Sequence, residues 1–285
     1  MTTPVAAGLQ AQYENIAHVC HEAFRAWCAT LGDTANPPWE QAEDWRRAFE
    51  LDGVRHVLAG ASPSEIHDLW RSRKTAAGWT YGAQKAPAVK QAANLVPYDQ
   101  IHNSAEMKKA ALFTSTALTL GCGVERWAVK TLTDPDAPNV NLTPVSSSVH
   151  DLVAIAAPAA PTARVSPTEF TTYQVTADLT YAKLETDSDI HMVLNDPGTG
   201  ETMIIEAACP SCAQGSVVAD QIAQVRQVVE AQFPEAVAGT PQDLAASPLH
   251  VTVTGVAFFD YAHGQRGLAS NGIELHPLLS FAVSG

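Results

Sequence analysis

The chain has 285 residues, a length that predicts about two domains, each able to bury its own core. Hydrophobic residues make up 46% of the sequence and charged residues 16%, which is ordinary globular usage and excludes a disordered or collagen-like chain. No run approaches the roughly 18 consecutive apolar residues of a membrane span, and the start of the chain lacks a secretion-signal pattern. We therefore expect neither a membrane protein nor an exported one.

The net charge of −13 is distributed unevenly. Residues 1–130 hold 13 basic and 13 acidic residues, whereas residues 131–285 hold 4 basic and 17 acidic residues. An acidic surface cannot release counterions from a phosphate backbone, so we predict no binding to nucleic acid. The five cysteines are an odd number, which does not indicate a disulfide framework, and we expect a reducing, cytoplasmic location.

Helical periodicity dominates the first half of the sequence. A stripe of apolar residues predicts a helix over residues 5–30, and Asn36-Pro37 is expected to cap and open a second helix. The sequence Ser62-Pro63-Ser64-Glu65 is a capping box, which predicts a third helix over residues 63–76. A fourth helix is expected from Ser104 to about Leu120.

The second half begins with a change of composition. Residues 131–167 are rich in proline and alanine and are interpreted as a linker or a wrapping segment, with a short helix near residues 149–155. Beyond them the apolar period becomes two, which predicts strands at 171–183, 191–194, 203–206, 251–259 and 273–283, with a helix at 217–233 before the last two. One face of the first strand is expected to carry Tyr173, Val175, Ala177, Leu179 and Tyr181.

Three strands, a helix and two strands are the order of an OB-type five-stranded barrel. We therefore predict an α+β protein with a helical domain over residues 1–130, the segment 131–167, and an acidic OB-like β-barrel domain over residues 168–285. The two domains are expected to fold separately, because domains commonly meet at proline-rich seams.

Aromatic motifs recur at fixed spacings between Ile66 and Leu112. They are His67-Asp68-Leu69-Trp70, Lys74, Gly78-Trp79-Thr80-Tyr81-Gly82, Leu95-Val96-Pro97-Tyr98, and Glu106 with Lys108. With these motifs the segment at about residues 62–120 resembles the RYR repeat family, the domain that recurs in ryanodine receptors and also occurs in bacterial and phage proteins. The sequence departs from the family at Ala92-Ala93 and Ala110-Ala111, so its ligand is expected to differ from that of other members or to be absent.

Six residues of this segment form a candidate ligand site. Aromatic rings can stack on a planar group while a lysine holds an anion, as a nucleotide-like ligand requires. The alternative interpretation makes the aromatic rings the core of a small domain that binds nothing. The candidate residues are Trp70, Lys74, Trp79, Tyr81, Lys90 and Tyr98.

The C-terminal stretch from Gly255 to Leu279 resembles a block found in uncharacterised bacterial proteins, a similarity that implies no activity. Glu274 and His276 are two residues apart on a predicted strand and so share a face. With residues from neighbouring strands they could form a histidine–carboxylate metal set that activates water for hydrolysis. Alternatively, they are satisfied polar residues at a barrel rim. The full set is His191, Glu206, Asp260, His263, Glu274 and His276.

Two further patterns limit the chemistry. Cys209-Pro210-Ser211-Cys212 has C-x-x-C spacing but lacks the strand-to-helix setting of a thioredoxin motif and the second pair of a zinc knuckle. The sequence contains no P-loop, dinucleotide-binding or nucleophile-elbow motif. The common nucleotide hydrolases and esterases are therefore not indicated.

The leading hypothesis is a non-enzymatic, cofactor-free protein whose RYR-like module recognises a small ligand or a protein partner. The first alternative is a metal-dependent hydrolase with its site on the barrel. The second is a structural subunit of a larger assembly, and a homo-oligomer is compatible with both the leading hypothesis and this one.

Overall fold

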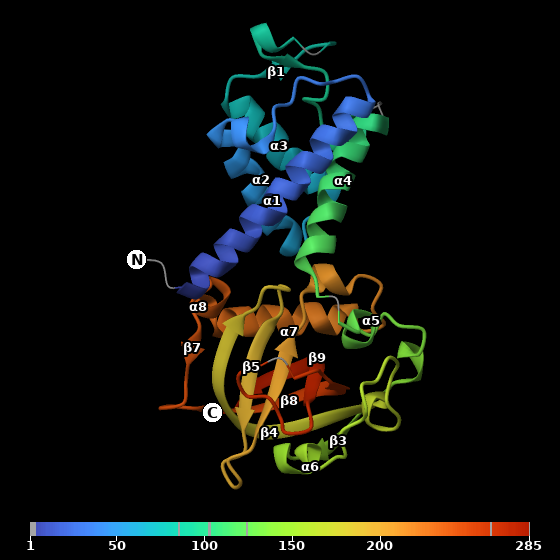
Figure 1. Ribbon diagram of the computed structural model, residues 1–285, viewed down its shortest axis with the longest axis vertical. Coiled ribbons are helices and arrows are strands. Elements are labelled where there is room, and N and C mark those ends of the chain that lie inside the picture. The colour runs from blue at the N-terminus through green and yellow to red at the C-terminus, as the bar shows by residue number, and fades with distance from the viewer. Residues whose placement is uncertain (1–3, 85, 102–103, 124, 263, 285) are drawn as a thin grey trace. The chain divides into compact units, whose positions relative to one another are not determined.

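A computed structural model describes residues 4–84, 86–101, 104–123, 125–262 and 264–284 and divides the chain into two compact units. We call Gln10–Gly121 the helical unit, and Met1–Leu9 with Cys122–Gly285 the barrel unit (Figure 1). Among the described residues, no helix combines the length and the apolar character needed to cross a membrane. Each unit has its own core and is described by itself.

Four helices build the helical unit: α1 (Pro4–Thr30), α2 (Asp44–Leu58), α3 (Pro63–Ala76) and α4 (Ser104–Gly121). Short 3-10 turns lie at Trp39–Gln41, Pro87–Val89 and Tyr98–Gln100, and the two-residue strands β1 (Thr80–Tyr81) and β2 (Gln91–Ala92) pair in parallel. The core is formed by apolar side chains of all four helices, among them Ile16, Val54, Val57, Ile66, Phe113 and Ala117. The predicted helical first half is confirmed.

Local sequence signals correctly predict the start of α3 but not the start of α2. The Ser62 side chain and the Glu65 side chain form the reciprocal capping box, so α3 begins at Pro63 as predicted. The prediction that Asn36-Pro37 opens the second helix is wrong, because α2 begins at Asp44. Pro37 is followed by Pro38, and a residue before proline is kept out of the helical region, so the chain stays extended.

Five strands close into a barrel in the barrel unit: β4 (Thr171–Leu184), β5 (Ile190–Asn195), β6 (Thr202–Ala207), β8 (Leu249–Phe259) and β9 (Ile273–Val283). The pairing order is β4-β5-β6-β9-β8, and β8 pairs back with β4. Only the β6–β9 pair is parallel within this closed set of described strands. Helix α7 (Ala219–Gln232) connects β6 to the C-terminal strands, so the predicted order and the α+β class are confirmed.

Strand β4 does not keep one face buried along its whole length. Val175, Ala177 and Leu179 are buried as predicted, but a shift of register between Leu179 and Tyr181 moves the core face to Ala182 and Leu184. Tyr181 is consequently half-buried, which corrects the expectation that it lies on the core face. A β-bulge adds one residue to a strand, and every later side chain then changes face.

The proline-rich segment 131–167 lies within the barrel unit. It contains β3 (Asn141–Ser147), which pairs in parallel with β4, and the short helix α6 (Val149–Val153). Short elements α5 (Trp127–Lys130), α8 (Pro234–Val237) and β7 (Gln242–Asp243) complete this unit. The compact unit thus begins at Cys122, earlier than the predicted boundaries at 130 and 168, and separate folding of the two units stays a prediction.

Candidate functional site

The turn that follows α3 carries the first candidate site. Gly78 adopts a positive φ of 82°, and the backbone N–H of Trp79 donates to the Lys74 carbonyl at 3.0 Å, which folds Trp79 back toward the helix. The Lys74 ammonium then lies 3.7 Å from the centroid of the Trp79 ring and 4.9 Å from that of Trp45. Trp79 is half-buried and Trp45 is 40% exposed, so this lysine and its two rings can be reached from solvent.

Lys90 and Tyr81 lie on either side of the same turn. Pairing of β1 with β2 places Thr80 opposite Gln91, and the Lys90 ammonium donates to the Ala77 carbonyl at 2.9 Å. Tyr81 is 58% exposed. The structure therefore places Lys74, Trp79, Lys90 and Tyr81 on or beside one turn.

The two remaining predicted residues pack on a histidine. The His67 ring lies 5.5 Å from the ring of Trp70 and 5.7 Å from that of Tyr98. His67 is buried, and its Nε2 donates to the Val96 carbonyl at 2.9 Å. Trp70 and Tyr98 are both half-buried. Trp45, the second ring over Lys74, is not among the predicted residues, because no sequence signal links it to Lys74.

A second candidate site is a buried charged network on strands β5, β6 and β9, on the face opposite to the barrel core. Of the predicted metal-binding residues, Glu206 lies between the two histidines, with its Oε1 3.2 Å from His191 Nδ1 and its Oε2 3.3 Å from His276 Nε2. Glu274 and Asp260 instead face the Lys130 ammonium, at 3.3 and 3.4 Å. His263, the sixth predicted residue, lies outside the described residues.

Sequence reasoning missed two central members of this network. Asp189, directly before β5, places its Oδ2 2.9 Å from His276 Nε2, and both side chains are fully buried. Lys130, at the end of α5, lies 3.8 Å from Glu206 Oε2 and joins this carboxylate to the other two. Lys130 falls at the end of the predicted helical domain, and an aspartate in a turn carries no distinguishing pattern, so neither residue could be connected to the barrel strands in advance.

Burial and close charges shift the pKa values of the basic groups. Burial alone would lower the pKa of His276, but hydrogen bonds to Asp189 and Glu206 raise it to about 10. The pKa of His191 is raised, because its bond to Glu206 outweighs the effect of burial. For Lys130, burial again acts downward, and the surrounding carboxylates, led by Glu274, hold the pKa above its usual range.

Among the acidic groups, the pKa of one carboxyl group is lowered and the pKa values of two others are raised. Burial would raise the pKa of Glu206, but Lys130 and the two histidines hold it well below its usual range. Burial raises the pKa of Glu274 well above its usual range, against the attraction of Lys130 and with the repulsion of Glu206. Burial, with repulsion from Asp189 and Glu206, also raises the pKa of Asp187 to about 7. The carboxyl groups of one buried network therefore have pKa values shifted in opposite directions.

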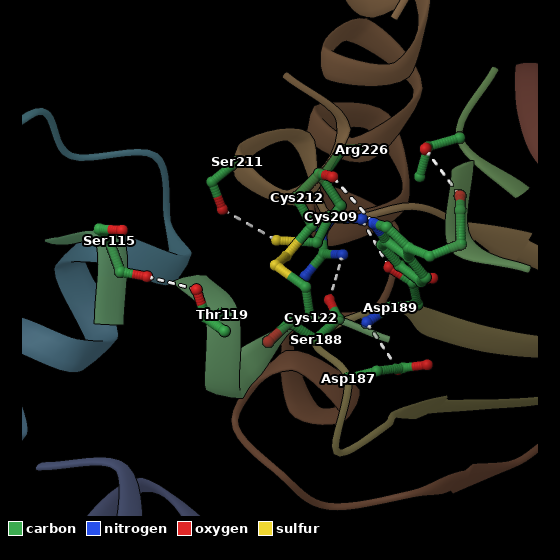
Figure 2. The surroundings of a disulfide bond; sticks show 12 residues. Ser115, Thr119, Cys122, Asp187, Ser188, Asp189, Cys209, Ser211, Cys212 and Arg226 are labelled. Atoms are coloured by element: carbon green, nitrogen blue, oxygen red, sulfur yellow. Dashed lines mark hydrogen bonds between the residues drawn. A yellow bond between two sulfur atoms is a disulfide. The ribbon is translucent and has the colours of Figure 1, made fainter. Parts of the chain in front are cut away.

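A disulfide supports this network from outside (Figure 2). Cys122 and Cys212 are bridged over a sequence separation of 90 residues, so one disulfide forms although the odd number of cysteines did not indicate a disulfide framework. Cys212 ends the predicted C-x-x-C motif, and the backbone N–H of Cys209 at its start donates to Asp189 Oδ1 at 2.6 Å. The bridge thus connects the Cys209–Cys212 segment, which is hydrogen-bonded to Asp189, to the segment that leads into α5.

Comparison with known families identifies one part of the chain. Residues 49–126 match the model of the RyR domain family, which confirms the resemblance stated on the motifs between Ile66 and Leu112. No curated protein and no solved structure matches the chain. The similarity of the C-terminal half to bacterial OB-like proteins is accordingly not confirmed, although its barrel order is the one predicted.

Proposed function

We propose that the protein is a non-enzymatic binding protein whose RyR domain takes a small planar anion, of the nucleotide type, on Lys74 and Trp79. The observation that carries this proposal is the ammonium of Lys74 at 3.7 Å from the centroid of the half-buried Trp79 ring. A ligand with an aromatic base and a phosphate would stack on a ring and pair its anion with the lysine.

Exposure separates this proposal from the alternative in which the aromatic rings only form a core. A ligand site requires that at least one of Trp70, Trp79 and Tyr98 be partly exposed, and all three are half-buried. The core of the helical unit is built instead from aliphatic side chains and Phe113. Lys90, beside the same turn, would provide a second positive charge for a phosphate group.

The test is a thermal-shift and tryptophan-fluorescence titration of the full chain with adenosine and guanosine mono- and triphosphates and with NAD. A ligand at a hundredfold excess over its dissociation constant is expected to stabilise the protein by about 2.7 kcal/mol. Lys74→Met is expected to weaken binding while changing the ligand-free stability by no more than about 0.5 kcal/mol, because a part-exposed lysine contributes little.

Lys109→Met is the matched control. Lys109 also lies over an aromatic ring, that of Phe24 at 5.6 Å, but it is outside the turn after α3. This variant should bind the ligand like the wild type. Flat melting curves with every nucleotide, or equal losses in the two variants, would contradict the proposal. A homo-oligomer stays a prediction, and the solution mass of the purified chain tests it.

A further inference from the structure

Three possible ligand atoms converge from three separate segments of the barrel unit. Asp189 directly precedes β5, Glu206 lies on β6 and His276 on β9. All three side chains are buried, and one donor atom of each lies within 4.8 Å of the other two. His276 Nε2 is 2.9 Å from Asp189 Oδ2 and 3.3 Å from Glu206 Oε2. Two ligand atoms that bind one metal ion at about 2.1 Å are roughly 3 to 3.4 Å apart, so this spacing suits a single ion.

The other polar atom of each side chain is held by an outer partner. Asp189 Oδ1 accepts the N–H of Cys209, and Glu206 Oε1 lies 3.2 Å from Nδ1 of His191. His276 Nδ1 lies 2.9 Å from the Lys130 carbonyl. That carbonyl can only accept, so Nδ1 carries a proton, and Nε2, which faces the two carboxylates, is the nitrogen that would release its proton to bind a metal. Outer partners of this kind fix the orientation of metal ligands.

Glu206 gives an observation that is independent of the clustering. Its side chain is only 10% exposed, and among the described residues its buried Oε2 accepts no well-aligned hydrogen bond; the nearest charged atoms are His276 Nε2 at 3.3 Å and the Lys130 ammonium at 3.8 Å. A buried carboxylate oxygen needs a compensating donor or cation. The Lys130 ammonium is 3.8 Å from this oxygen but closer to Glu274 and Asp260, at 3.3 and 3.4 Å. Lys130 therefore lies closer to the other two carboxyl groups than to Glu206.

We propose that Asp189, Glu206 and His276 bind one divalent transition-metal ion, Zn²⁺ or Mn²⁺. One imidazole nitrogen and two carboxylate oxygens are suitable ligands for both ions. Three protein ligands leave a coordination position open. The site keeps Glu206 and His276 from the predicted set and adds Asp189. It lies wholly in the barrel unit and does not depend on a ligand in the helical unit.

The experiment uses the untagged full-length chain, treated with a chelator and dialysed. Titration calorimetry with Zn²⁺ and, separately, with Mn²⁺ is combined with elemental analysis of the bound metal. We expect one equivalent of at least one of the two ions. Glu206→Gln and Asp189→Asn keep the shape of the side chain but remove a ligand charge, and each is expected to weaken binding by about tenfold or more. Circular dichroism verifies that each variant is folded.

Glu274→Gln is the matched control, because Glu274 is an equally buried carboxyl group beside Lys130 that is not one of the three ligands. Its metal affinity should stay close to that of the wild type. A wild type that binds neither ion overturns the proposal, and so does a control that loses as much affinity as Glu206→Gln. If the ligand variants do not fold, Co²⁺ added to the wild type decides: a visible spectrum without a thiolate charge-transfer band supports the site, and no spectrum or a thiolate band contradicts it.

Discussion

The two units use lysine in opposite ways. In the helical unit, Lys74 lies over the rings of Trp79 and Trp45 where solvent and ligands can reach it. In the barrel unit, Lys130 is buried among carboxyl groups and is a part of the interior itself. Loss of the first lysine is expected to change the stability little, whereas loss of the second would leave buried charges uncompensated.

Burial also affects how the acidic second half of the sequence contributes to the surface charge. Glu169, Asp189, Glu206 and Glu274 are all buried, so part of the net charge of −13 is not on the surface. Glu169 is paired with Arg126 at 2.5 Å, and both side chains are almost completely buried. An excess of acidic residues in a sequence therefore does not by itself describe the field outside the molecule.

The largest effect on stability is expected when the barrel unit is expressed as fragments that begin at different residues. A fragment of residues 122–285 should unfold cooperatively, whereas a fragment of residues 168–285 should not fold, because it lacks Arg126 and Lys130, the buried partners of four acidic residues. Circular dichroism during urea titration measures both fragments. A cooperative transition in the shorter fragment would show that the segment before residue 168 is a linker.

Removal of Lys130 alone should be the next largest effect. Lys130→Met is expected to destabilise the barrel unit by about 3–5 kcal/mol, because breaking a buried ion network leaves uncompensated charges. Lys183→Met is the control, since Lys183 forms a part-exposed pair with Glu185. It should cost no more than about 1 kcal/mol. Hydrogen exchange in increasing urea follows each unit separately, and equal losses in the two variants would contradict the assigned role of Lys130.

The disulfide gives an intermediate effect. Cys122→Ser with Cys212→Ser is expected to lower the stability of the barrel unit by about 2–4 kcal/mol, because the bridge closes a long loop of the unfolded chain. Dithiothreitol should destabilise the wild type similarly and leave the double variant unchanged. Thiol titration of the unreduced, denatured wild type should find three thiols among the five cysteines. A count of five would show that the bridge does not form.

The smallest effect concerns pH and the helical unit. His21 is buried with its Nδ1 2.8 Å from Glu50 Oε2, and although burial acts downward, the bonds to Glu50 and the Pro37 carbonyl raise its pKa. A raised pKa stabilises the fold fully below the unfolded value of about 6.5, and this contribution is lost as the pH rises through the folded value. The helical unit should therefore be less stable at about pH 9 than at about pH 6.

Tryptophan fluorescence can follow this change, because five of the six tryptophans lie in the helical unit. His21→Gln should flatten the pH dependence. His67→Gln is the control, since it removes a buried histidine that is bonded to the carbonyl of Val96 rather than to a carboxylate. An unchanged slope in His21→Gln would assign the pH dependence to other groups.

What the sequence determined by itself was local. The capping box placed the start of α3, the alternation of apolar residues located the five barrel strands, and the RyR motif brought Lys74 and Trp79 together within about one turn. These features depend on residues close together in the chain, where backbone geometry alone fixes which side chains meet.

Only the tertiary structure decided the rest. The bridge from Cys122 to Cys212 spans 90 residues, and the contacts of Asp189 and Lys130 with His276 and Glu206 depend on how β5, β6, β9 and α5 close around one interior. The same holds for Trp45 over Lys74 and for the bulge that turns Tyr181 away from the core face. The sequence does not indicate whether a charged side chain is buried, because its partners lie on segments that are distant in the chain. Packing between those segments brings the partners together and supplies the free energy that keeps them there.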